Sequence, residues 1–116
     1  MDLAKKLQIP PGAPIFLVNP PAGFDSGVRV SREPGVAVLV FANSSKHLTE
    51  DARPAIDAAK QDRISWIAYP KAGQLGTDLH RDKLVKLMKP HGIEGVRMVS
   101  IDGVWSAMRF RPARRE

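Results

Sequence analysis

The chain contains no cysteine, few aromatic residues and no long apolar run. Without cysteine it cannot form a disulfide, a thiolate zinc site or an iron–sulfur cluster, and its composition fits a reducing compartment. No segment approaches the roughly 18 apolar residues of a transmembrane helix, and the N-terminal stretch lacks the apolar run of a signal peptide. We therefore expect a cytoplasmic protein with no membrane partner.

A chain of 116 residues is in the range of a single domain. We expect that domain to span residues 1–111 and to be followed by a flexible basic tail at 112–116. The net charge is +6, and one group of basic residues lies along an expected helix while another crowds the C-terminus. The C-terminal group consists of Arg109, Arg111, Arg114 and Arg115. It makes non-specific nucleic-acid binding one open hypothesis, although the interleaved aromatic residues of a base-stacking surface are missing.

Strand and helix patterns alternate along the chain. Short apolar runs predict strands at 15–18, 36–42 and 64–69, with a brief edge strand at 28–30. The run at 36–42 is apolar at every position, which is typical of a central parallel strand covered on both faces.

Helices are expected between these strands. A short amphipathic helix is predicted at 2–8, and a second one runs to about Lys60 with a break at Pro54. A third helix follows an N-cap at Thr77 or Asp78. Its buried stripe is expected to consist of Leu84, Leu87 and Met88.

The C-terminal part of the chain predicts a hairpin. Asp102-Gly103 separates strand patterns at 96–101 and 104–110, and Asp-Gly between two strands is a strong hairpin signal. Together these patterns indicate an α/β, three-layer, Rossmann-like domain with a mostly parallel sheet closed by a C-terminal antiparallel hairpin.

Three motifs give the sequence a family resemblance. They are Leu7-Gln-Ile-Pro-Pro-Gly12, Tyr69-Pro-Lys71 with Thr77-Asp-Leu-His-Arg-Asp82, and Asp102-Gly-Val-Trp-Ser-Ala-Met-Arg-Phe110. With them the chain resembles a family of small bacterial proteins of unknown function, which in turn resembles shortened, degenerate Rossmann-type methyltransferases. The resemblance implies that strand 104–110 lies between 64–69 and 96–101, antiparallel to both.

The stretch Leu17-Val-Asn-Pro-Pro-Ala-Gly-Phe24 raises the question of methyl transfer, because Asn-Pro-Pro followed by an aromatic residue is a signature of amino-methyltransferases. In those enzymes the motif follows the fourth strand, whereas here it follows the first, and Ala22 replaces the aromatic residue. Two prolines also remove backbone donors where a cofactor loop needs flexible glycines. We interpret the motif as a stiff turn, and we expect no cofactor and no binding of S-adenosylmethionine.

The loops that follow the parallel strands form the best candidate site, because the carboxyl ends of such strands meet at one edge of a sheet. They contribute amide and hydroxyl groups, a lysine and the start of a helix, whose free N–H groups attract anions. The candidate ligand-binding residues are Asn19, Asn43, Ser44, Lys71, Thr77 and Asp78. The alternative is that Asp78 caps the helix, Asp82 pairs with Lys86 and Lys71 is solvated.

No catalytic or metal-binding motif is recognisable. The histidines His47, His80 and His91 lie in three different segments, which gives no ligand spacing. Three function hypotheses stay open. The first is a non-enzymatic Rossmann-like domain that binds a small anionic ligand or a protein partner, the second is a diverged transferase-like enzyme, and the third is a basic protein associated with nucleic acid.

Overall fold

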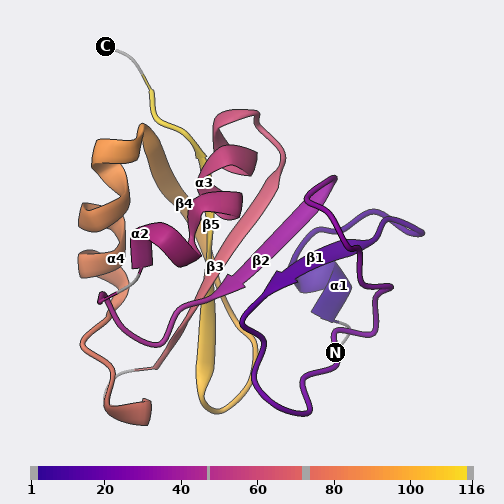
Figure 1. Cartoon of the computed structure of the whole chain (residues 1–116), viewed down its shortest axis with the longest axis horizontal. Coiled ribbons are helices and arrows are strands. Elements are labelled where there is room, and N and C mark those ends of the chain that lie inside the picture. The colour runs from indigo at the N-terminus through magenta and orange to yellow at the C-terminus, as the bar shows by residue number, and fades with distance from the viewer. Residues whose placement is uncertain (1–2, 47, 72–73, 115–116) are drawn as a thin grey trace.

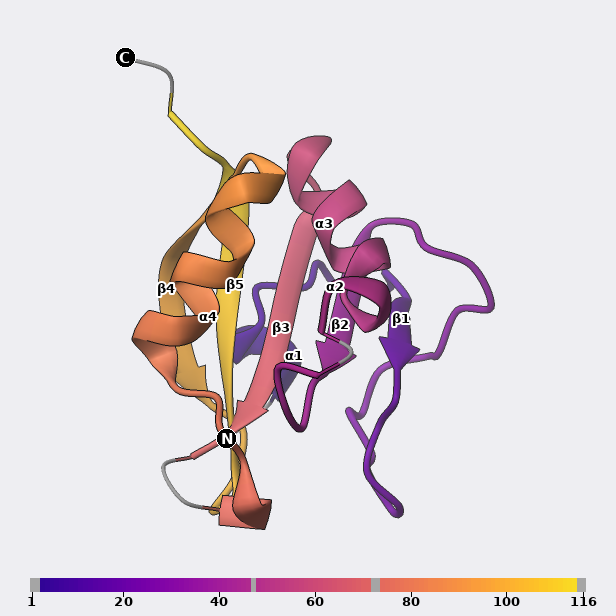
Figure 2. The same cartoon turned by 60° about the vertical axis from the view of Figure 1, so that its left-hand side comes forward.

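The computed structural model describes residues 3–46, 48–71 and 74–114. They form an α/β fold with a five-stranded mixed sheet in the order β1-β2-β3-β5-β4 (Figures 1 and 2). The strands are β1 Ile15–Val18, β2 Ala37–Phe41, β3 Ile64–Pro70, β4 Ile93–Ser100 and β5 Trp105–Pro112. The helices are α1 Leu3–Lys6, α2 Leu48–Asp51, α3 Arg53–Lys60 and α4 Arg81–Met88, with 3₁₀ turns η1 Gln74–Gly76 and η2 Lys89–His91.

The sheet begins parallel and ends antiparallel. Strands β1, β2 and β3 pair in parallel, whereas β5 is antiparallel to both of its neighbours, β3 and β4. The predicted place of strand 104–110 between 64–69 and 96–101 is therefore confirmed. The expected edge strand at 28–30 is reduced to one parallel bridge between Val30 and Ile15.

Strand β2 is buried along its whole length, as its uninterrupted apolar sequence predicts. Its side chains alternate between two hydrophobic clusters, one on each face of the sheet. Val38 and Val40 belong to the cluster beneath α2, α3 and α4. Leu39 and Phe41 belong to the cluster on the α1 side.

The two faces of the sheet are covered differently (Figure 2). Helices α2, α3 and α4 lie on one face, and they bury Leu48, Ile56, Leu84 and Met88 among other residues. The opposite face is covered by the four-residue helix α1 and by residues of the long connection between β1 and β2. On that side Trp66 Nε1 donates a hydrogen bond of 2.9 Å to the carbonyl of Leu7, which fixes the segment after α1 against the sheet.

Proline determines where helix α2 ends and helix α3 begins. The predicted break at Pro54 is confirmed, because α2 ends at Asp51 and α3 begins at Arg53 with proline in its first turn. In α4 the predicted buried stripe is only partly right. Leu84 and Met88 are fully buried, but Leu87 is exposed because it lies on the side of α4 that faces away from the sheet.

The Asp-Gly hairpin is present, but its strands are longer than predicted. Asp102 Oδ1 accepts hydrogen bonds from the backbone N–H groups of Val104 (2.8 Å) and Trp105 (2.9 Å), which organises the turn. Strand β4 starts at Ile93, three residues before the predicted start at 96, and a bulge interrupts its pairing with β5 between Gly95 and Arg97. No helix in the described ranges is long and apolar enough to cross a membrane.

Candidate functional site

The six candidate residues predicted from the sequence lie at the carboxyl ends of the parallel strands. Some of them are exposed there, and others make hydrogen bonds within the protein. Asn19 follows β1 and is exposed, with a backbone φ of 54°. Asn43 and Ser44 follow β2 and are also exposed. Thr77 is engaged locally, because its hydroxyl accepts a hydrogen bond of 3.0 Å from the N–H of Leu79.

Asp78 connects the loop after β2 to helix α4. Its carboxylate accepts hydrogen bonds from the backbone N–H of Ser45 (2.9 Å) and from the Ser45 hydroxyl, and it pairs with Lys83 Nζ at 2.9 Å. The hydrogen bonds from Ser45, followed by the one from Lys83, hold the pKa of Asp78 well below its usual value. The backbone N–H and the hydroxyl of Ser45 are thus already bound to a carboxylate of the protein itself.

Helix α4 is capped by His80, so the prediction of Thr77 or Asp78 as its N-cap is wrong. His80 has an extended backbone and its Nδ1 accepts a hydrogen bond of 3.3 Å from the N–H of Lys83. The helix starts later than predicted because Thr77 and Asp78 direct their side chains to Leu79 and Ser45. Asp82 pairs with its neighbour Arg81 at 3.4 Å rather than with Lys86, its partner in the alternative interpretation of the sequence.

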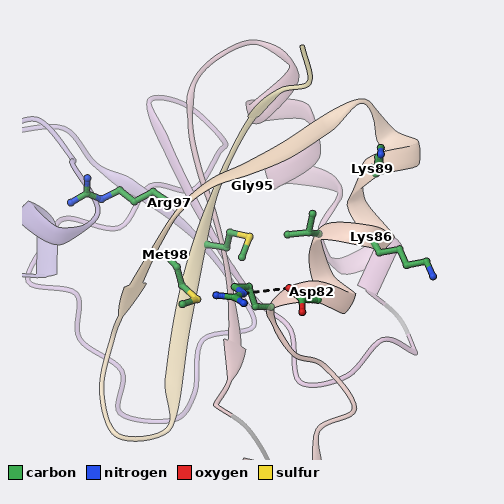
Figure 3. A pocket seen from close by; sticks show the side chains of 9 residues that line it. Asp82, Lys86, Lys89, Gly95, Arg97 and Met98 are labelled. Atoms are coloured by element: carbon green, nitrogen blue, oxygen red, sulfur yellow. Dashed lines mark hydrogen bonds and ion pairs between the residues drawn. The ribbon is translucent and has the colours of Figure 1, made fainter. Parts of the chain in front are cut away.

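A groove runs between α4 and the hairpin strands β4 and β5 (Figure 3). Its volume is about 510 Å³, and its apolar surface comes from Val85 of α4, Met98 of β4 and Met108 of β5. Gly95 of β4 leaves room for this arrangement, because a Cβ at that position would lie 2.3 Å from Met108 Sδ and 3.3 Å from Val85 Cγ2. Glycine in a strand thus marks a close approach between two elements.

Charged residues surround this apolar groove. Helix α4 contributes Arg81, Lys86 and Lys89, and the one acidic residue in the lining is Asp82. Figure 3 shows Lys86 extending outward from the helix, and it shows Arg97 pointing away from the groove. The cationic groups therefore border the groove while its floor stays apolar.

A second hollow of about 320 Å³ continues the groove toward the end of β3. The two share Arg81, Asp82 and Met98, and the second adds Tyr69, Lys71, His80 and Ser106. Lys71 Nζ donates a hydrogen bond of 2.8 Å to the Ser100 hydroxyl, which holds the ammonium group at the groove end. The Tyr69 hydroxyl donates to Met98 Sδ at 2.8 Å, and burial raises the pKa of Tyr69, so this phenol stays protonated.

Of the candidate ligand-binding residues, Lys71 lies in the second hollow, whereas the methionines of the groove were missed. Met98 is 47% exposed although it lies in a strand. The signal that could have revealed the groove is Gly95, because a glycine inside a strand pattern indicates a bulge or a close approach. His47 and Arg115, which the sequence also singled out, lie outside the described residues.

Comparison with protein-family models, curated proteins and solved structures found no match to this chain. Within residues 3–46, 48–71 and 74–114 there is no group of three or more histidine or acidic residues that could hold a metal ion.

Proposed function

We propose that the protein is a non-enzymatic α/β domain that binds a small amphiphilic anion in the groove between α4 and the β4–β5 hairpin. The observation that carries the proposal is the combination of an apolar floor with cationic groups at its border, continued to Lys71 at the end of β3. Such a combination of an apolar surface with a few placed polar groups is typical of small-molecule sites.

The lining suggests how the two parts of the ligand would bind. Met98 and Met108 offer flexible, polarisable side chains that adapt to an apolar body. Arg81 and Lys71 would contact the anionic end, since charge-assisted hydrogen bonds to an oxyanion are stronger than neutral ones. The volumes of about 510 Å³ and 320 Å³ are within the usual range of roughly 300–1,000 Å³ for ligand pockets.

A shortened Rossmann-like arrangement belongs to the same proposal. The bridge from Val30 to Ile15 takes the chain to one side of β1, whereas β2 and β3 follow on the other side. This reversal lies at β1, on the edge of the sheet opposite the groove, so the link between the groove and the carboxyl ends where open α/β sheets bind ligands rests on Lys71 alone. Lys71 directly follows β3 at the carboxyl end of that strand.

The test is a titration of the labelled protein with octyl phosphate, octanol and inorganic phosphate, followed by backbone amide shifts. We expect octyl phosphate to bind more tightly than octanol or inorganic phosphate alone. It should shift the backbone amide signals of residues 81–89 and 95–98. Arg81→Gln should weaken this binding about tenfold, since it removes a charge-assisted contact. Arg53→Gln, an equal loss of charge at the start of α3, is the matched control and should leave it unchanged.

Two results would contradict the proposal. Shifts confined to 19–24, 43–45 and 77–79 would place the ligand at the rim predicted from the sequence rather than in the groove. Saturable calorimetric heat with S-adenosylmethionine, at a dissociation constant below roughly 100 μM, would favour a diverged transferase instead of a non-enzymatic domain.

A further inference from the structure

A cluster of three arginines lies on the face of the sheet opposite the groove. Strand pairing places Arg97 of β4 directly beside Arg109 of β5, and Arg111 follows two residues later on the same face of β5. The bulge between Gly95 and Arg97 contributes to this arrangement, because the extra residue Val96 changes which face the following side chains occupy. Figure 3 shows the result for Arg97, which points away from α4.

The three guanidinium groups line a hollow of about 440 Å³. Gln8, Asp62 and Val96 complete the lining, so Asp62 is its one acidic residue. Asp62 Oδ1 lies 3.6 Å from Arg111 Nε, and its negative charge also acts on Arg109. Within this lining three positive charges thus face the charge of Asp62, and Glu94 of β4 lies opposite Arg111 just beyond it.

The guanidinium of Arg109 combines one hydrogen bond with a buried donor that is unpaired among the described residues. Its Nη1 donates a hydrogen bond to Gln8 Oε1. Its Nε is buried and makes no hydrogen bond to any part of the chain that the structure describes. Burial, followed by the positive charge of Arg111, lowers the pKa of Arg109. An anion in the hollow would reduce the repulsion among these positively charged groups.

We propose that the hollow formed by Arg97, Arg109 and Arg111 binds a phosphate group. Guanidinium groups present paired N–H donors that match the oxygens of phosphate, and three of them can surround one tetrahedral oxyanion. The phosphate belongs either to a small phosphorylated molecule or to the backbone of a nucleic acid, because both offer the same oxyanion. An adjoining hollow toward the end of β5 is lined by Arg111 and Arg114 together with the acidic Glu94.

The experiment titrates the full chain with inorganic phosphate and with a single-stranded oligonucleotide of about 12 nucleotides, which is within the span of a single-strand site. Arg97 and Arg111 are exposed, so the variants Arg97→Gln and Arg111→Gln should keep the fold. Unchanged amide signals from residues outside the hollow verify this. We expect each variant to weaken phosphate binding about tenfold. Arg32→Gln, an equal loss of charge in the exposed loop before β2, should leave binding unchanged.

Salt dependence separates the two sources of the phosphate. If the phosphate belongs to a nucleic-acid backbone, the oligonucleotide should bind more tightly than inorganic phosphate. The logarithm of its association constant should then fall with the logarithm of the salt concentration, with a slope of about −0.7 for each phosphate contacted. A small-molecule source predicts that inorganic phosphate and the oligonucleotide bind with similar affinity. The proposal is overturned if phosphate leaves the amide signals of Arg97, Arg109 and Arg111 unmoved, or if Arg32→Gln weakens binding as much as the cluster variants.

Discussion

Gly95 is the residue on which the shape of the groove depends most directly, because Met108 occupies the space that a side chain would fill. Gly95→Ala should lower the free energy of unfolding by about 1–3 kcal/mol, the usual cost of overpacking. Gly103→Ala is the matched control, since a Cβ at that position would meet nothing within 4 Å. Urea unfolding of both variants measures the difference. Equal stability of Gly95→Ala and the unmodified protein would show that the flexible Met108 side chain moves aside without cost and that the groove does not depend on Gly95.

Asp78 should make the stability depend on pH. Its pKa in the folded protein lies below the usual value of 3.8 because it accepts hydrogen bonds from Ser45 and Lys83. Because the pKa of Asp78 is lower in the folded than in the unfolded protein, its charged carboxylate stabilises the fold at pH values above the pKa of the unfolded state. This contribution is lost progressively as the pH falls below about 4. Asp78→Asn should therefore be less stable than the unmodified protein at about pH 6, and the gap should shrink toward about pH 3.

Urea midpoints across this pH range test the prediction. Asp57→Asn, which removes an exposed carboxylate on α3, serves as the control and should keep the pH dependence of the unmodified protein. A gap between Asp78→Asn and the unmodified protein that stayed constant with pH would show that the contacts of Asp78 do not depend on its charge.

Some of these residue roles could be predicted and others could not. Lys71 was found because a lysine after a strand and before a helix is a local pattern. The bond between Ser45 and Asp78 joins residues 33 positions apart, and no local pattern contains it. The same holds for Arg97 and Arg109, which become neighbours only through the register of the hairpin.

At the scale of elements, a substitution at the start of α4 should change both the stability of the fold and the binding of the ligand. His80→Asp should raise the free energy of unfolding by about 0.5–1 kcal/mol, because aspartate is a better N-cap and its charge interacts favourably with the helix dipole. The same change places a negative charge beside Lys71 and Arg81, so it should weaken binding of octyl phosphate. Thermal unfolding and the amide titration measure the two effects.

His80→Asn is the control for this pair of effects, since it supplies a capping side chain without a charge. It should raise stability and leave octyl phosphate binding largely unchanged. If both variants weakened binding equally, His80 itself would contact the ligand and the charge would not be responsible.

The elements with strong local signals were predicted well. Pro54 separated α2 from α3, and Asp102-Gly103 defined the hairpin between β4 and β5. The start of α4 was predicted incorrectly because two capping side chains, Thr77 and Asp78, precede the histidine that caps the helix. The early start of β4 was missed because Glu94 and Gly95 interrupt the apolar pattern of that strand.

At the scale of the whole molecule, the two hydrophobic clusters should unfold together, because alternate residues of β2 and β3 contribute to both. Trp66 and Trp105 belong to the cluster on the α1 side, whereas α3 and α4 cover the other cluster. Tryptophan fluorescence therefore reports on the α1 side, whereas the helical part of the far-ultraviolet circular dichroism comes mainly from α3 and α4 on the opposite face. Their denaturation curves should coincide, as in a two-state transition. A fluorescence change at lower denaturant would show that the α1 side opens separately.

The bulge in β4 has a consequence for solubility. Strand β4 is the outermost strand of the sheet, and such a strand offers backbone groups to which another chain can add. The bulge interrupts the regular spacing of these groups, and the charged side chains of Glu94 and Arg97 lie on either side of it. A second copy added antiparallel around this point would bring two Arg97 side chains together. The irregularity that places Arg97 beside Arg109 thus also makes this edge a poor template for pairing with a second chain.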